Sequence, residues 1–290
     1  MVFTNIPGGI VYKQIDAAVA PLGHSIVGVV TTPGPPRRRS SSYLDVVAAV
    51  RPGIDVIVAN HPNRLAAMVA PMRPDLIISG GFPYLIPAEV IALPAVAAIN
   101  LHPALLPKYR GPCAVEWALR NGDRELGFTI HRLAAGFDTG AILAQGTLPI
   151  YDDDDFPALV GRMGALVPDL LHHALQRLAR GEDGDPQDET QASYAGMFEP
   201  EWRTIDSSRP ARTIHNQVRS WIGMRDLPAG AIGTLSGEKL VITRTRLIPG
   251  NFAGDSMPVP GTIIQRKTDC MVVQCGDGPL EVIAWGPAGA

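Results

Sequence analysis

The chain has 290 residues, of which 46% are hydrophobic and 18% charged, and its formal net charge is −3. This composition excludes a globally disordered chain, because the apolar content is high and the net charge is small. No apolar run approaches the ~20 residues of a membrane-spanning helix, and the start of the chain lacks the basic segment of a signal peptide. We therefore expect a cytoplasmic enzyme that binds neither a membrane nor DNA.

The cysteines are few and do not suggest a metal centre. Cys113, Cys270 and Cys275 are odd in number and lack metal-ligand spacing, which favours reduced thiols. We expect no metal in this protein.

The first half of the chain alternates short β-branched runs with segments of helical spacing. Strands are expected at 25–32, 55–59, 75–80 and 97–101, and helices at 10–22, 63–70 and 87–93. Such alternation predicts βαβ units and a doubly wound, mostly parallel sheet. In a sheet of this kind ligands bind beside the carboxyl ends of the strands.

The second half has a different pattern. A long helical stretch, 156–180, ends at a glycine and is followed by a polar segment of linker composition. A helix is expected at 211–221, and short runs between glycines at 240–247, 261–265, 270–275 and 280–285 predict a small β-barrel. We therefore predict a catalytic domain at 1–185, a linker at 186–205 and a C-terminal β-barrel domain at 206–290.

The strongest candidates for chemistry lie at the end of the strand expected at 97–101 and in the loops that follow. Alternation along that strand places Asn100 and His102 on one face at its carboxyl end. An amide can donate to a developing oxyanion, and an imidazole can move a proton near neutral pH. Asp138, in a loop flanked by glycines, is the candidate carboxylate partner. Taken alone, these residues also fit a strand cap, a satisfied histidine and a turn aspartate.

A set of motifs around these residues is shared with one enzyme family. The motifs are Asn100-Leu101-His102, Leu105-Leu106-Pro107, Tyr109-Arg110-Gly111 and Asp138-Thr139-Gly140. Together they resemble the 10-formyltetrahydrofolate-dependent formyltransferases, and among these most closely the methionyl-tRNA formyltransferases. The resemblance extends over 80–87, 190–194, 210–215 and 275–278 and is weakest at the start of the chain.

The resemblance implies a fold, a donor and a set of roles. The fold would be a Rossmann-like α/β formyltransferase domain with a small OB-like β-barrel, and the donor would be 10-formyltetrahydrofolate. Asn100, His102 and Asp138 match the family's catalytic trio. The residues implied at the donor are Phe82, Leu85, Ile86, Pro87, Leu105, Gly136, Phe137, Thr139 and Gly140.

Two loops depart from the pattern of the methionyl-tRNA formyltransferases. The first loop, 4–9, lacks the usual aromatic-Gly-Thr-Pro, and the stretch 32–42 is shorter than the family's basic loop, although it keeps three arginines. Three adjacent arginines could contact phosphates, but a solvated surface loop is equally consistent with them. The residues expected at the acceptor are Asn5, Pro7, Gly8, Arg37, Arg38, Arg39, Tyr109 and Arg110.

These departures favour an acceptor that is a small-molecule or carrier-borne amine or hydroxylamine. The alternatives are initiator Met-tRNA as acceptor, water as acceptor (10-formyltetrahydrofolate hydrolysis), and a catalytically silent RNA- or folate-binding relative. We expect a monomer or weak dimer. Two further features are interpreted as structural: the acidic run 152–155 as a cap for the next helix, and His131 as a core residue of its strand.

Overall fold

The computed structural model describes residues 1–34, 40–223, 229–250 and 257–288. It contains two compact units that interleave along the chain. The α/β unit comprises Met1–Pro112, Gly127–Leu148 and Arg162–Tyr194, and the β unit comprises Cys113–Leu126, Pro149–Gly161 and Ala195–Ala290. The contiguous division at 185 and 205 stays a prediction.

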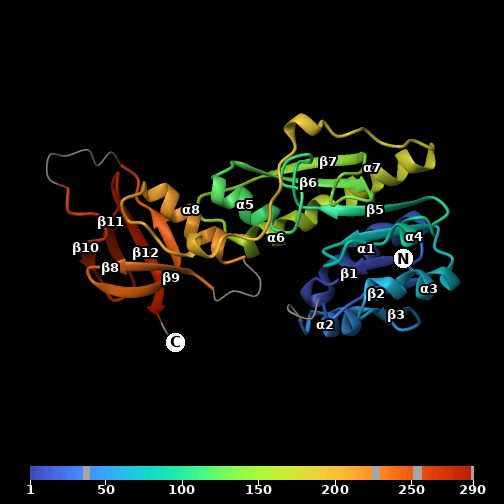
Figure 1. Cartoon of the computed structure of the whole chain (residues 1–290), viewed down its shortest axis with the longest axis horizontal. Coiled ribbons are helices and arrows are strands. Elements are labelled where there is room, and N and C mark those ends of the chain that lie inside the picture. Colours follow the sequence, from blue (N-terminus) through green and yellow to red (C-terminus); the bar gives the residue numbers. More distant parts are fainter. Residues whose placement is uncertain (35–39, 224–228, 251–256, 289–290) are drawn as a thin grey trace. The chain divides into compact units, whose positions relative to one another are not determined.

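A seven-stranded sheet organises the α/β unit (Figure 1). In spatial order its strands are β3 (Asp55–Val58), β2 (Gly28–Thr31), β1 (Val2–Thr4), β4 (Leu76–Gly80), β5 (Ala97–His102), β6 (Glu125–Arg132) and β7 (Ile142–Pro149). The first five are parallel, and β6 runs antiparallel to β5. This confirms the mostly parallel, doubly wound sheet. The strand order reverses between β1 and β4, so the loops that follow these strands border the crevice where such sheets bind ligands.

The described helices are short, and two of them, α2 and α5, fall where no helix is expected from the sequence. Their bounds are α1 (Ile10–Val19), α2 (Ser42–Ala49), α3 (Leu65–Val69), α4 (Ala88–Ile91), α5 (Ala114–Asn121), α6 (Phe156–Met163), α7 (Val167–Ala179) and α8 (Ala211–Trp221). Short 3-10 turns adjoin several of them, at Pro7–Gly9 (η1), Ala20–Leu22 (η2), Pro62–Arg64 (η3), Ala70–Met72 (η4), Gly164–Leu166 (η5), Glu189–Gln191 (η6) and Pro200–Arg203 (η7). Within the described residues, none of the helices is long and apolar enough to cross a membrane.

The single helix expected over 156–180 is divided in two. A 3-10 turn at Gly164–Leu166 separates α6 from α7, and a proline occupies the first turn of α7. Proline lacks the N–H that a continuous helix would use. A Cβ at Gly164 would lie 2.2 Å from Nε2 of Gln14 in α1, so the turn also allows a close approach between these segments. The acidic run that precedes α6 caps it as expected, because Asp155 Oδ1 accepts a hydrogen bond from the backbone N–H of Ala158.

The β unit contains a five-stranded antiparallel sheet (Figure 1). Its strands, in spatial order, are β10 (Ile263–Arg266), β11 (Met271–Gln274), β12 (Pro279–Pro287), β9 (Glu238–Leu247) and β8 (Ala231–Leu235). The segments beside the two edge strands meet: Ser236 N–H donates to the Gly261 carbonyl at 2.9 Å, and Ile263 N–H to Ser236 Oγ at 2.9 Å. Register shifts interrupt the β12–β9 and β10–β11 pairings, and irregularities of this kind increase the local twist of a strand.

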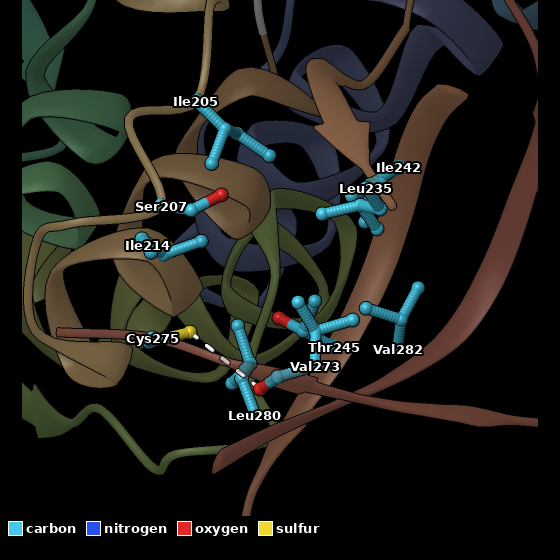
Figure 2. A pocket seen from close by; sticks show the side chains of 10 residues that line it. All are labelled: Ile205, Ser207, Ile214, Leu235, Ile242, Thr245, Val273, Cys275, Leu280 and Val282. Atoms are coloured by element: carbon cyan, nitrogen blue, oxygen red, sulfur yellow. Dashed lines mark hydrogen bonds between the residues drawn. The ribbon is translucent and has the colours of Figure 1, made fainter. Parts of the chain in front are cut away.

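Helix α8 covers the interior of this sheet with Ile214 and Val218. The interior keeps a void of about 10 Å³, lined almost entirely by apolar side chains (Figure 2). A void of that size holds about one water molecule, and an apolar one stays dry. We therefore assign it to the packing of the core and not to a ligand.

Candidate active site

The predicted strand end forms the base of the site. Asn100 and His102 lie at the carboxyl end of β5. The antiparallel register with β6 places Asn100 opposite His131 and His102 opposite Thr129. His102 and His131 are both buried, at 4% and 1% exposure. The β5–β6 pair therefore contributes two imidazoles and one amide to the same place.

Asp138 completes the cluster from the loop between β6 and β7. Its carboxylate accepts a hydrogen bond from Asn100 Nδ2 at 3.2 Å and another from the Gly111 N–H at 2.8 Å. It also lies 3.6 Å from His102 Nδ1 and 3.4 Å from His131 Nε2. The structure thus brings together the three residues that the sequence motifs indicated.

The conformation of the Asp138 loop explains its glycines. Asp138 has a left-handed φ of 54°, which is uncommon for a residue with a side chain. A Cβ at Gly140 would lie 1.8 Å from the carbonyl oxygen of Arg132. Only glycine allows the loop to approach β6 this closely, and this approach is what carries the carboxylate to the two imidazoles.

The hydrogen bonds of the imidazoles define their tautomers. His102 Nε2 lies 2.8 Å from the Tyr109 carbonyl oxygen, so this nitrogen is protonated and donates a hydrogen bond to that oxygen. His131 Nδ1 likewise donates to the Arg132 carbonyl at 2.8 Å. In neutral His131 the other nitrogen, Nε2, therefore accepts from Asn100 Nδ2, which lies 3.2 Å away. The amide nitrogen of Asn100 thus faces both Asp138 and His131.

The electrostatics keep the carboxylate charged. Burial raises the pKa of Asp138, but the neighbouring His131, His102 and the Gly111 N–H together lower it to about 2. Burial lowers the pKa of His102 below its usual value, against the opposing effect of Asp138. At neutral pH Asp138 is therefore an anion and a very weak base.

The residues expected at the donor differ in exposure. Ile86 is buried in the core of the α/β unit, and Phe82 packs edge-on against Phe3 at 5.4 Å. By contrast, apolar side chains of three other expected residues remain exposed: Leu85 by 43%, Leu105 by 37% and Phe137 by 52%.

The remaining donor candidates shape the backbone. Thr139 Oγ1 donates to the Gly136 carbonyl at 3.2 Å, which fastens the Asp138 loop. Pro87 precedes α4 at its N-terminal boundary. A role of these residues at the donor stays a prediction.

The residues expected at the acceptor are partly engaged within the fold. Asn5 is buried and its Oδ1 accepts from Thr31 Oγ1 at 3.1 Å. Pro7 and Gly8 form a 3-10 turn, in which the Gly8 N–H donates to Asp45 Oδ2. Arg37, Arg38 and Arg39 lie outside the described residues.

Tyr109 and Arg110, also expected at the acceptor, form hydrogen bonds within the fold. Tyr109 has a left-handed φ of 59°, and its carbonyl accepts from His102. The Arg110 guanidinium donates to the side chains of Gln187 and Glu189. These contacts give Arg110 a structural role that the sequence interpretation did not include, and its contact with an acceptor stays a prediction.

Sequence reasoning missed two residues of the site. His131 is a buried residue of its strand, as expected, but it also lies beside Asn100 and Asp138. Alternation along its strand could have placed it on the same face as Thr129, but the antiparallel register with β5 has no signal in the sequence. Gln187 belongs to the segment expected to be a linker, and it contacts both loops of the site.

Comparisons with known proteins identify the family of the chain. Residues 12–175 match the formyl transferase family, and residues 198–289 match the formyl transferase C-terminal domain. A methionyl-tRNA formyltransferase of Citrifermentans bemidjiense is 36% identical over 267 residues, which cover 90% of this chain and 80% of that protein. One from Roseiflexus sp. is 34% identical and covers 100% of this chain and 88% of that protein.

Solved structures share the fold at low sequence identity. An N-formyltransferase from Helicobacter canadensis, in complex with folinic acid and dTDP-3-aminofucose, has a TM-score of 0.68 at 17% identity and covers 98% of each chain. HypX from Aquifex aeolicus in complex with tetrahydrofolic acid has a TM-score of 0.65 at 18% identity. The present chain spans 43% of the length of that HypX chain.

A carboxylate held between two imidazoles and an amide at the edge of a doubly wound sheet defines an enzyme site suited to acyl transfer. The chain belongs to the formyl transferase family. The formyl donor of this family is 10-formyltetrahydrofolate. The expected family, enzyme class and donor are thereby confirmed.

Proposed function

We propose that the chain transfers the formyl group of 10-formyltetrahydrofolate to the amine of a small-molecule or carrier-borne acceptor, at the cluster of Asn100, His102 and Asp138. The observation that carries this proposal is the position of the Asp138 carboxylate between both imidazoles and the Asn100 amide. The exposed apolar side chains of Leu85 and Leu105 support it, since a flat pterin ring requires such surfaces.

The donor supplies the formyl carbon, and attack by an amine places negative charge on the formyl oxygen. Asn100 is the residue suited to stabilise that charge, an effect typically worth about 3 kcal/mol for one donor. Its amide nitrogen contacts both Asp138 and His131, so one of these contacts is exchanged for the oxyanion.

The role of Asp138 follows from its charge. With a pKa of about 2 it is too weak a base to hold the proton of the amine. It instead stabilises positive charge on His102, whose Nδ1 faces the carboxylate. As the new C–N bond forms, the amine proton passes through water to His102 Nδ1 and from there to N10 of the folate, whose bond to the formyl carbon breaks to release tetrahydrofolate and the N-formyl product.

The preference for a small acceptor rests on the first loop and on charge. The segment 4–9 lacks the aromatic-Gly-Thr-Pro of the tRNA-formylating relatives, and the whole chain carries a net charge of −3. Initiator Met-tRNA is the second candidate. It is favoured by the 36% identity with a methionyl-tRNA formyltransferase and by the match to the C-terminal domain.

The acceptor is tested by turnover of 10-formyltetrahydrofolate in three parallel reactions. One contains charged initiator Met-tRNA, one contains a panel of amino sugars, diamines and hydroxylamines, and one contains no acceptor. Turnover that depends on a panel amine supports the proposal. Turnover that depends on Met-tRNA alone supports the second candidate, and equal turnover without any acceptor indicates a hydrolase.

A further inference from the structure

Gln187 occupies the centre of a bridge between the two loops that hold the catalytic cluster. Its Oε1 accepts from Arg110 Nε at 3.0 Å and from Arg110 Nη2 at 2.6 Å. Its Nε2 donates to the Asp138 carbonyl at 2.7 Å and to the Gly140 carbonyl at 2.8 Å. Every donor and acceptor site of this one amide is therefore used, two on each loop.

The first of these loops fixes His102. The Tyr109 carbonyl accepts from His102 Nε2, and the Gly111 N–H donates to the Asp138 carboxylate. Arg110 lies between these two residues in the chain. Because Gln187 and Glu189 bind the Arg110 guanidinium, they hold both flanking backbone groups in register with the cluster.

The second loop fixes Asp138 itself. The Gln187 amide donates hydrogen bonds to the backbone carbonyls of Asp138 and Gly140, so it stabilises the turn that contains the carboxylate. Tyr109 and Asp138 both have left-handed φ angles, 59° and 54°. Residues with side chains persist in that conformation where surrounding contacts hold them there, at a cost of about 1 kcal/mol or more each. Gln187 supplies such contacts to both loops at once.

We propose that Gln187 is a positioning residue for formyl transfer, which sets the distance between His102 and Asp138 by joining the Arg110 loop to the Asp138 loop. The proposal rests on the function proposed above for this cluster. Gln187 lies in Arg162–Tyr194, a stretch of the same α/β unit that contains the cluster.

The chemistry of the amide makes this role specific. Replacement by glutamate keeps an acceptor for Arg110 but removes both donors and places a carboxylate against the carbonyls of Asp138 and Gly140. Replacement by methionine keeps the length and removes all four hydrogen bonds. Gln191 is a matched control, because it is an exposed glutamine of the same segment. Its Nε2 donates a hydrogen bond to Asp188 Oδ2, which lies outside the two loops of the cluster.

The test compares Gln187→Glu and Gln187→Met with Gln191→Glu and Gln191→Met in the full chain. We expect kcat of both Gln187 variants to fall about 10- to 100-fold, with KM for 10-formyltetrahydrofolate within about threefold of the parent value and thermal unfolding near that of the parent. The Gln191 variants are expected to retain parental kcat.

A second readout does not depend on turnover. The charged and titratable groups that face His102 are Asp138 and His131. If Gln187 sets the His102–Asp138 distance, its loss weakens the effect by which Asp138 raises the pKa of His102. The imidazole signals of His102, followed by ¹⁵N-edited NMR without substrate, should then titrate at lower pH in Gln187→Met than in the parent.

The two readouts separate the possible failures. A parental kcat together with an unchanged His102 titration in the folded Gln187 variants would overturn the positioning role. Loss of turnover with an unchanged His102 titration would also overturn it, because the loss would then arise elsewhere. A shifted titration in a protein whose parent transfers no formyl group to any acceptor would support the positioning role and overturn the proposed function.

Discussion

Asn100 and His131 face each other across the antiparallel pair β5–β6, with 3.2 Å between the amide nitrogen of one and Nε2 of the other. This contact exists because the sheet changes from parallel to antiparallel at β5. The antiparallel strand brings a second imidazole to the strand end where parallel α/β sheets collect ligand-binding side chains. His131 and Asp138 therefore lie side by side at the Asn100 amide, with 3.4 Å between His131 Nε2 and Asp138 Oδ1.

Replacement of His131 should impair catalysis more than binding. His131→Leu removes the acceptor of the Asn100 amide, and we expect kcat to fall about tenfold while KM for the donor stays within about threefold. His131→Gln offers an oxygen in place of Nε2 and should recover part of the rate. Steady-state kinetics of both variants check this. Equal losses in the two variants would contradict the orienting role of His131.

Gly140 should tolerate no side chain. A Cβ there would meet the Arg132 carbonyl, which also accepts from His131 Nδ1. We expect Gly140→Ala to lower the unfolding free energy by about 1–3 kcal/mol and to abolish most turnover. Chemical denaturation measures the first effect and donor turnover the second.

Gly161 is the matched control for that substitution. It lies in α6, and no heavy atom lies within 4 Å of where its Cβ would be. Gly161→Ala should stabilise the protein by about 0.5–1 kcal/mol, because alanine favours helix. If the two alanines had the same effect, the close approach at Gly140 would have no energetic consequence.

His215 should make the β unit sensitive to acid. It is buried, it donates from Nε2 to the Asp152 carbonyl at 2.7 Å, and its Nδ1 lies 2.9 Å from Thr245 Oγ1. Burial lowers its pKa to about 4 from 6.5. Between these values the unfolded chain binds a proton that the folded one does not. The contribution of neutral His215 to the free energy of unfolding is therefore complete above pH 6.5. It is lost as the pH falls toward 4, by about 3 kcal/mol in total.

Tryptophan fluorescence during urea unfolding measures this dependence. The four tryptophans of the chain are Trp117, Trp202, Trp221 and Trp285, and all lie in the β unit. His215→Gln should flatten the pH dependence between 4 and 6.5. A slope as steep as that of the parent would assign the acid sensitivity to other groups.

The sheet could be predicted because its strands β2 and β4 are buried on both faces. The β-branched runs that became β2, β3 and β4 are short, apolar and separated by helical spacing, and this is the pattern of βαβ units. The division of the helix at Gly164 was not predicted, since the periodicity continues across the break. Gly164 lies close to Gln14 of α1, and such proximity between residues far apart in the chain is not encoded in the periodicity.

The site was predictable only in part. Asn100, His102 and Asp138 lie in short motifs that are contiguous in the sequence, so the resemblance to the formyltransferases could identify them. His131 and Gln187 act through contacts over 31 and 49 residues of sequence, with Asn100 and with Asp138 respectively. Such contacts follow from strand register and loop conformation, which spacing does not encode.

We propose that formyl transfer at this cluster requires the negative charge of the Asp138 carboxylate, which faces both imidazoles and the Asn100 amide. The most direct measurement is single-turnover formyl transfer by Asp138→Asn beside direct binding of the donor. Asparagine preserves the shape of the side chain and removes the charge. We expect a loss of at least about 100-fold in the transfer rate with donor affinity nearly unchanged. Near-parental transfer by Asp138→Asn would contradict it.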